Sequence, residues 1–176
     1  PDWHRLVTHA LDLGLLVALG SNGTLIDAAM AKTLAGLPIK LQLSLDGGTA
    51  AVHDRIRGAG SFARTRAAID LLRTAGKGED LVVAFTPMRL NRAEVEPFID
   101  LMEALEIRVV QFPPLACSGR ARRDWSELIL GDDDRLELWR TIAAQAPRLR
   151  GRMDLLADCF SLNIDRPGEP YRCNIG

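Results

Sequence analysis

The sequence predicts an α/β fold with a parallel sheet, either doubly wound or part of a (β/α) barrel. Two observations lead to this prediction: apolar runs of strand length alternate with longer amphipathic stretches, and each amphipathic stretch is long enough for a crossover helix. Strands joined by such helices pair in parallel, with right-handed connections. With 176 residues and 47% hydrophobic side chains, the chain can bury one core.

Each expected element has its own signal along the chain. Leu6, Val7 and Leu11 recur at helical spacing, and Gly14 ends that first helix before the apolar run at residues 15–19. Three later helices start at short polar residues, and these expected N-caps are Asp27, Ser61 and Asn91. We expect strands at residues 15–19, 39–45, 81–86 and 107–112, and helices at 28–35, 61–75, 92–105 and 132–146.

The strand at residues 39–45 alternates between apolar and polar side chains. Side chains of a strand repeat every two residues, so its leucines share one face: Leu41, Leu43 and Leu45. Its polar residues share the other: Gln42, Ser44 and Asp46. Strands covered on both faces are normally apolar throughout. The polar face therefore predicts a cavity for a polar ligand, with an exposed sheet face as the alternative.

Polar residues follow the expected strand ends, which is where parallel α/β folds bind ligands. Beyond the second strand, Arg57 could hold a carboxylate in a bidentate pair, and the alternative is a solvated run of charge. Asp46 precedes two glycines, which is ordinary turn chemistry. Ser21 and Asn22 follow the first strand and could form a turn or offer polar groups to a ribose.

Charge and composition exclude several classes of protein. The 22 basic and 23 acidic residues give a formal net charge of −1, which argues against nucleic acid as a partner and against a polybasic membrane-surface protein. Apolar runs fall far short of the roughly 18 residues of a membrane span, and no signal segment opens the chain, so we expect a cytoplasmic protein. Three cysteines, an odd number, are too few for a disulfide scaffold.

Several short motifs follow one another in a distinctive order and spacing across about residues 1–125. They are Ser21-Asn22-Gly23-Thr24, Leu43-Ser44-Leu45-Asp46-Gly47, His53-Asp54-Arg55-Ile56-Arg57-Gly58, Gly60-Ser61-Phe62, Thr86 with Asn91 and Glu94, and Gly119-Arg120-Ala121. Together they resemble the radical S-adenosylmethionine (radical SAM) enzymes. The chain is most similar to the SPASM subgroup, which has a cysteine-rich extension and includes anaerobic sulfatase-maturating and pyrroloquinoline quinone biosynthesis enzymes.

The resemblance implies a six-stranded partial (β/α) barrel of TIM-like type, of which this chain would hold four βα units. Residues 1–150 would be the C-terminal part of that barrel, and residues 151–176 a linker and the start of a SPASM-like extension. The family's three-cysteine loop, which binds a 4Fe-4S cluster, would lie upstream of this sequence. We therefore expect the isolated chain to be inactive.

The resemblance also implies roles for individual residues. Ser44 and Arg57 match positions that bind the methionyl carboxylate of S-adenosylmethionine. Ser21 and Asn22 match the segment near its ribose and methionine, and Leu115 matches a position that lines the adenine pocket. Two further residues are Cys173, which matches the first ligand of an auxiliary iron–sulfur cluster, and Asp46, a lower-ranked cofactor residue that also fits a supporting role in the turn.

For the intact protein, the resemblance implies reductive cleavage of S-adenosylmethionine to a 5′-deoxyadenosyl radical that abstracts hydrogen from a peptide or protein. An electron donor such as flavodoxin or ferredoxin would supply the electron. The alternative is a cluster-less relative that serves as a peptide-binding or scaffolding module. We further expect the isolated chain to dimerise or aggregate through the exposed edge of its first strand.

Overall fold

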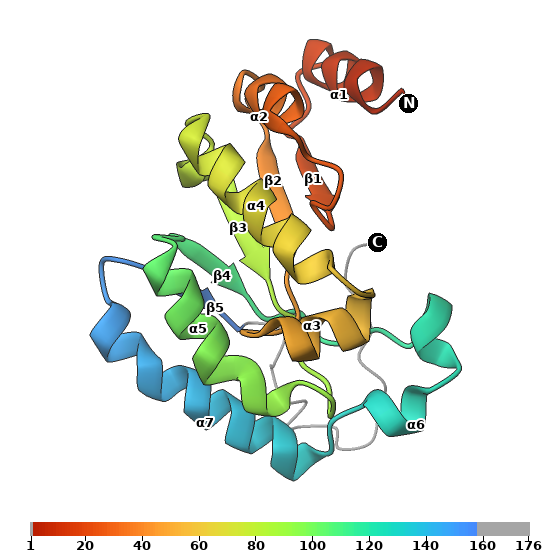
Figure 1. Ribbon diagram of the computed structural model, residues 1–176, viewed down its shortest axis with the longest axis vertical. Coiled ribbons are helices and arrows are strands. Elements are labelled where there is room, and N and C mark those ends of the chain that lie inside the picture. The colour runs from red at the N-terminus through yellow and green to blue at the C-terminus, as the bar shows by residue number, and fades with distance from the viewer. Residues whose placement is uncertain (1, 158–176) are drawn as a thin grey trace.

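The computed structural model describes residues 2–157, which form a five-stranded parallel sheet (Figure 1). The strands lie side by side in chain order: β1 (Ala18–Ser21), β2 (Lys40–Ser44), β3 (Leu81–Ala84), β4 (Val109–Gln111) and β5 (Asp154–Leu156). A doubly wound sheet would reverse its strand order at one point. The unbroken order therefore confirms the α/β class and favours part of a barrel over a doubly wound sheet.

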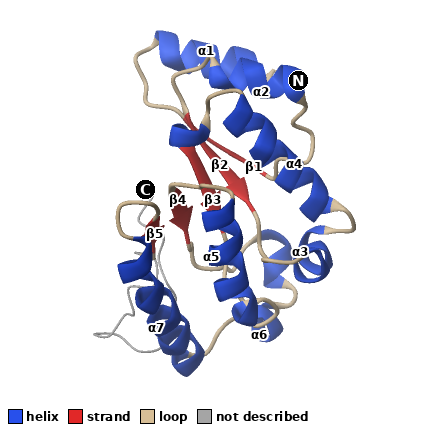
Figure 2. Ribbon diagram, turned by 60° about the vertical axis from the view of Figure 1, so that its left-hand side comes forward, coloured by secondary structure: helices blue, strands red, loops and turns tan. Residues whose placement is uncertain are grey.

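Helices connect successive strands and lie along the sheet (Figure 2). The α-helices are α1 (Trp3–Asp12), α2 (Ala28–Ala35), α3 (Ala50–Arg57), α4 (Ser61–Thr74), α5 (Val95–Ala104), α6 (Trp125–Leu128) and α7 (Asp132–Leu149). Three 3-10 turns accompany them: η1 (Gly78–Asp80), η2 (Arg92–Glu94) and η3 (Gly119–Arg122). Among the described residues, no helix is both long enough and apolar enough to span a bilayer.

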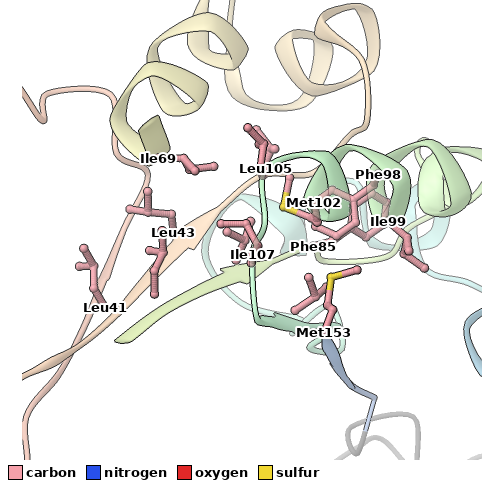
Figure 3. Close-up of a cluster of buried hydrophobic side chains, with 14 of the residues drawn as sticks. Leu41, Leu43, Ile69, Phe85, Phe98, Ile99, Met102, Leu105, Ile107 and Met153 are labelled. Atoms are coloured by element: carbon pink, nitrogen blue, oxygen red, sulfur yellow. The ribbon is translucent and has the colours of Figure 1, made fainter. Parts of the chain in front are cut away.

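The hydrophobic core lies between one face of the sheet and helices α2, α4, α5 and α7. Figure 3 shows the part of it that includes Ile69 of α4 and Phe98, Ile99 and Met102 of α5. The leucines of β2 belong to it, which confirms the apolar face that the alternation predicts: Leu41, Leu43 and Leu45 are fully buried. Farther along the sheet, Phe85, Phe98 and Phe112 form an aromatic group with ring centroids 4.9 to 6.0 Å apart. Burial of each such side chain contributes about 1.5–3 kcal/mol.

The first strand starts later than the apolar run predicts. The run covers residues 15–19, whereas β1 covers Ala18–Ser21. Ala18 pairs with Lys40, the first residue of β2, and the Val17 carbonyl accepts from the Lys40 N–H at 3.0 Å, so residues 15 and 16 lie before the paired part of the sheet. Leu16 is fully exposed as a result.

Three of these helices and strands were absent from the sequence prediction: the short helix α6, helix α3 and strand β5. Helix α3 lies in the stretch that could be read as a solvated run of charge, and its one buried residue is His53. Strand β5 pairs with β4 over three residues and adds a fifth strand to the four that we expected. It lies just past residue 150, the expected end of the barrel region, and its short length gave no recognisable periodic signal.

Of the expected N-caps, one is confirmed. The Asp27 carboxylate accepts from the Met30 N–H at 2.8 Å and caps α2. Ser61 does not cap α4, because Gly60 occupies the cap position in the left-handed conformation that glycine tolerates. Asn91 precedes η2, but its side chain makes no cap bond and contacts Met88 and Thr86 of its own loop and Asp46 of the preceding one.

Candidate functional site

A polar row crosses the open face of the sheet, opposite the core. In neighbouring strands, Ser44 pairs with Ala84 and Ala84 pairs with Gln111, so these residues point to the same side. Gln42 lies two residues earlier on that face of β2. Gln42, Ser44 and Gln111 are half-buried, and in the described part of the chain their side chains make no hydrogen bond. The predicted polar face is therefore present, as an open surface with unused donors and acceptors.

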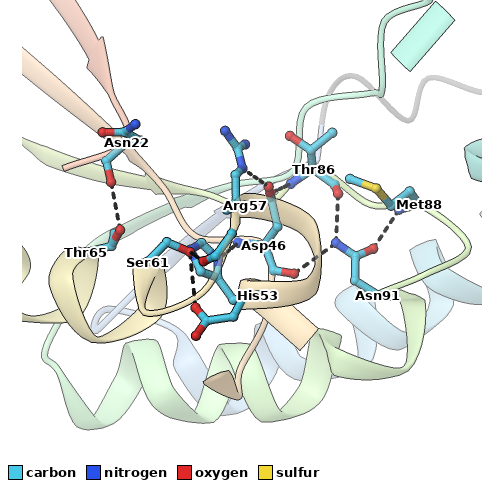
Figure 4. A network of polar contacts seen from close by, with 11 residues as sticks. Asn22, Asp46, His53, Arg57, Ser61, Thr65, Thr86, Met88 and Asn91 are labelled. Carbon is cyan, nitrogen blue, oxygen red and sulfur yellow. Dashed lines mark hydrogen bonds and ion pairs between the residues drawn. The ribbon is translucent and has the colours of Figure 1, made fainter. Parts of the chain in front are cut away.

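Asp46 forms the centre of a polar network at the carboxyl end of this row (Figure 4). It is fully buried. One carboxylate oxygen pairs with Nε of Arg57 at 2.5 Å, and the other accepts from the Thr86 N–H at 2.8 Å. The main chain of Asp46 is held too: its N–H donates to Nδ1 of His53 at 2.9 Å, and its carbonyl accepts from Asn91 at 3.1 Å. Asp46 thus joins the ends of β2 and β3 to helix α3.

Contacts with the β3–α5 connection fix the loop that follows Asp46. The Glu94 carboxylate accepts from the N–H and the hydroxyl of Thr49 at 2.9 and 2.8 Å. Gly48 lies so close to α5 that a Cβ there would stand 2.6 Å from the Phe98 nitrogen. A Cβ on Gly47 would stand 2.9 Å from the His53 nitrogen. Only glycines allow this close approach of two backbones, so the loop has little freedom to move.

Asp54 of α3 fixes the start of α4. Its carboxylate accepts from the N–H groups of Gly60 and Phe62, both at 2.7 Å, and from the Ser61 hydroxyl at 3.1 Å. The Phe62 N–H is the largest cause that lowers the pKa of Asp54, because it stabilises the charged form. Asp54 thus performs the capping role that the sequence assigned to Ser61.

Arg57 stands at the end of α3 with its guanidinium directed past Asp46. Its side chain is 30% exposed, whereas that of Asp46 is 1% exposed. The ion pair uses Nε, and the terminal nitrogens make no hydrogen bond within residues 2–157. Arg57 is therefore oriented by one carboxylate and keeps the donors that a second carboxylate requires.

Ser21, the last residue of β1, and Asn22 form a local turn at the end of that strand. The Ser21 hydroxyl accepts from the Gly23 N–H at 3.1 Å, and the Asn22 side-chain oxygen accepts from the Thr24 N–H at 3.1 Å. The Asn22 carbonyl accepts from the Thr65 hydroxyl at 2.7 Å, which ties the turn to α4. The turn therefore uses these oxygens as acceptors, and within the described residues the Ser21 O–H and the Asn22 side-chain nitrogen remain as donors for a ligand.

The remaining predicted site residues are Leu115 and Cys173. Leu115 is half-buried in the loop after β4. Cys173, the expected ligand of an auxiliary cluster, lies outside the described residues. Within residues 2–157, Cys117 is an exposed free thiol, and no three histidine, cysteine or acidic side chains are grouped closely enough to hold a metal ion. The described residues therefore do not fit an iron–sulfur cluster.

Sequence reasoning missed three residues of the site. Gln111 gave a weak signal as a polar residue within an apolar strand. No local sequence signal predicts the roles of His53 and Asn91, because each binds a residue in another turn. Asp46 is 7 positions from His53 and 45 positions from Asn91.

Comparison with protein families identifies the fold. The model of the Radical SAM superfamily matches residues 1–102, more than half of the chain. The chain belongs to the radical SAM superfamily. This radical SAM chain is 32% identical over 152 residues to mycofactocin maturase MftC of Mycobacterium ulcerans, and the match covers 85% of the chain but 40% of the relative. It is 39% identical over 77 residues to an AdoMet-dependent heme synthase of Methanosarcina barkeri, covering 43% and 22%.

Solved structures with the same fold include two proteins of low sequence identity to this chain. SuiB of Streptococcus suis is 13% identical with a TM-score of 0.70, covering 87% of this chain and 35% of SuiB. Native anSMEcpe with bound AdoMet and the Kp18Cys peptide is 16% identical with a TM-score of 0.66, covering 86% and 46%. The chain thus spans less than half the length of these proteins, and the partial-barrel fold is confirmed.

Proposed function

We propose that this chain forms the S-adenosylmethionine-binding part of a radical SAM enzyme that modifies a peptide or protein. The observation that carries the proposal is the partly exposed Arg57 guanidinium, held by buried Asp46 at the carboxyl end of the polar row. Family membership and the AdoMet bound to a fold neighbour support the choice of ligand.

Arg57 and Ser44 would bind the methionyl carboxylate of the cofactor. A carboxylate fits the free terminal nitrogens of Arg57 because guanidinium donors match its two oxygens. Ser44 would add a hydroxyl donor from the open face of β2, and the free amide nitrogen of Asn22 would face the ribose or methionine end. Half-buried Leu115 would line the adenine side.

The network around Asp46 would keep this binding group in place before the ligand arrives. Asp46 and Arg57 are joined at 2.5 Å, and the loop between them is packed against α5. A side chain that is already ordered loses little conformational entropy on binding. The 4Fe-4S cluster, when bound by residues outside the described part, would supply the electron that cleaves the cofactor to a 5′-deoxyadenosyl radical.

A peptide is the substrate class that the comparisons support. The relatives reported above include a maturase, and solved neighbours hold the Kp18Cys peptide and the precursor peptide SuiA. These similarities favour an enzyme over a cluster-less binding or scaffolding module. A flavodoxin- or ferredoxin-type electron donor, an auxiliary cluster at Cys173, a cytoplasmic location, dimerisation and the inactivity of the isolated chain stay predictions.

The experiment that tests this function compares cofactor affinity in matched variants of the complete, cluster-reconstituted protein. Arg57→Ala and Ser44→Ala should each lose a hydrogen bond to a charged group, which costs about 1.5–3 kcal/mol, or roughly 10- to 150-fold in affinity. Arg55→Ala is the control, because Arg55 is an exposed arginine of the same helix with no ion pair in the described residues. Equal affinity in Arg57→Ala and Arg55→Ala would contradict the assignment.

A further inference from the structure

Among the described residues, the ring of His53 has a single polar contact, which is with the Asp46 N–H. The imidazole is fully buried, and its Nδ1 accepts from the Asp46 N–H at 2.9 Å (Figure 4). Its Nε2 is also buried and has no hydrogen-bond partner within residues 2–157. The edge of the ring packs against Phe62, with ring centroids 6.0 Å apart.

This contact determines the protonation state of the ring. A nitrogen that accepts a hydrogen bond carries no proton, so neutral His53 must carry its proton on Nε2. A second proton, on Nδ1, would place two N–H groups face to face and break the contact with Asp46. The ring can therefore hold Asp46 only while it is neutral.

Two side chains bind the main chain of Asp46, one at the peptide group before its Cα and one at the peptide group after it. His53 binds its N–H, and Asn91 binds its carbonyl at 3.1 Å. A peptide fixed in this way also fixes the direction in which the Asp46 side chain leaves the backbone. That direction sets the position of the carboxylate that holds Arg57 at 2.5 Å.

Three charged groups act on the ring in addition to its burial. Burial is the largest cause that lowers the pKa of His53, since the charged form loses its water. The Asp46 carboxylate opposes this effect, the Arg57 guanidinium adds to it, and the Asp54 carboxylate opposes it. The sum keeps the pKa below the ordinary 6.5, so the ring is neutral at neutral pH.

We propose that neutral His53 is a positioning residue for Arg57, acting through the Asp46 peptide, and that protonation of its ring weakens cofactor binding. The proposal rests on the proposed function, in which Arg57 binds the methionyl carboxylate. The proposal assigns a role to His53, which would contact no ligand. It also predicts that cofactor affinity depends on pH.

The contact itself can be tested on this chain without any ligand. A nitrogen-15 NMR spectrum at pH 8 should show the His53 ring with its proton on Nε2 and an accepting Nδ1. Exchange of the Asp46 amide hydrogen should be faster in His53→Leu, which fills space without an acceptor, by about 2- to 12-fold. His53→Asn, whose side-chain oxygen can accept at about the Nδ1 position, should restore slow exchange. A proton on Nδ1 in the wild-type ring would overturn the proposal even where a variant fails to fold.

The link to the cofactor is tested by the pH dependence of affinity in the complete, cluster-reconstituted protein. Wild-type affinity for S-adenosylmethionine should be level at and above pH 6.5 and should fall only at a lower pH, where the His53 ring gains its second proton. In His53→Asn that fall should be absent, while His9→Asn, at an exposed histidine of α1, should behave as wild type. The same fall in wild type and His53→Asn would overturn the link. An absence of cofactor binding in every protein would remove the proposed function and this link together, while the NMR result would still decide the contact.

Discussion

Asp46 is engaged at every polar group it has. Its two carboxylate oxygens hold Arg57 and Thr86, and its main chain is bound by His53 and Asn91. A buried carboxylate is costly unless such partners surround it. These four contacts offset the cost of burying Asp46, and one of them orients Arg57.

Replacement of Asp46 should reduce stability as well as binding. Asp46→Ala leaves the Thr86 N–H and the Arg57 Nε without an acceptor, which should lower the free energy of unfolding by about 1–3 kcal/mol. Urea denaturation of this chain measures the change. Asp70→Ala is the matched control, because Asp70 is an exposed partner of Arg66 on α4, and such a pair contributes about 0–1 kcal/mol. Equal losses in the two variants would show that the network has no special role.

Asp54 should make the chain sensitive to acid. Its pKa lies below the ordinary 3.8 in the folded state, so the unfolded chain binds the proton first as the pH falls. The contribution of Asp54 to the free energy of unfolding is fully present above pH 3.8. It is lost as the pH falls from 3.8 to the lower pKa that Asp54 has in the folded chain. Asp54→Asn should be less stable at pH 7 and should lose less on acidification in that range. Parallel urea midpoints for both proteins between pH 7 and pH 3 would refute this expectation.

At the scale of single elements, the close approach of the Gly47–Gly48 loop to α5 gives a direct test of packing. Gly48→Ala places a methyl group 2.6 Å from backbone atoms at residues 97 and 98, where nothing can yield without moving α5. The cost should be about 1–3 kcal/mol in the free energy of unfolding, as for overpacked cores. Cofactor affinity should fall with it, because the same loop carries Asp46.

Gly36→Ala is the control for this prediction. Gly36 ends α2 with a φ of −76°, and a Cβ there would meet its nearest neighbour at 3.6 Å. Alanine fits that conformation and restricts the unfolded chain, so stability should be unchanged or higher by about 0.4–1 kcal/mol. Thermal unfolding of both variants against wild type checks the pair. A Gly48→Ala protein as stable as Gly36→Ala would show that the loop is not tightly held.

The elements also show how far local sequence signals reach. The alternation in β2 predicted both its buried leucines and its polar face, because strand periodicity is a local property. Helix α3 was missed because its charged surface hid a single buried residue, His53. β5 was missed because three residues are too few to show a period, and pairing with β4 identifies it. The Asp46 network depends on contacts between distant loops, which no local pattern encodes.

The whole molecule is a sheet with a core on one side and a polar row on the other. Its first strand, β1, pairs with β2 along one edge only among the described residues. The connection before it exposes Leu13, Leu15 and Leu16, at 63%, 56% and 103%. An unpaired strand edge beside exposed leucines favours association between copies.

Association of the isolated chain should therefore be measurable. We expect light scattering to show dimers or larger species, and Leu16→Glu to shift the distribution toward monomer by placing a charge beside the edge. Leu156→Glu, at the opposite edge strand β5, is the control and should shift it less. A monodisperse wild-type monomer would contradict this prediction.

The most direct test of the proposed function is the fate of S-adenosylmethionine itself. The complete protein, reconstituted with iron and sulfide under anaerobic reducing conditions, should form 5′-deoxyadenosine. At limiting cofactor, Arg57→Ala should form it roughly 10- to 150-fold more slowly, in line with the loss of a charged hydrogen bond, and Arg55→Ala should match wild type. An absence of 5′-deoxyadenosine from the wild-type protein, or equal rates in wild type and Arg57→Ala, would contradict the account.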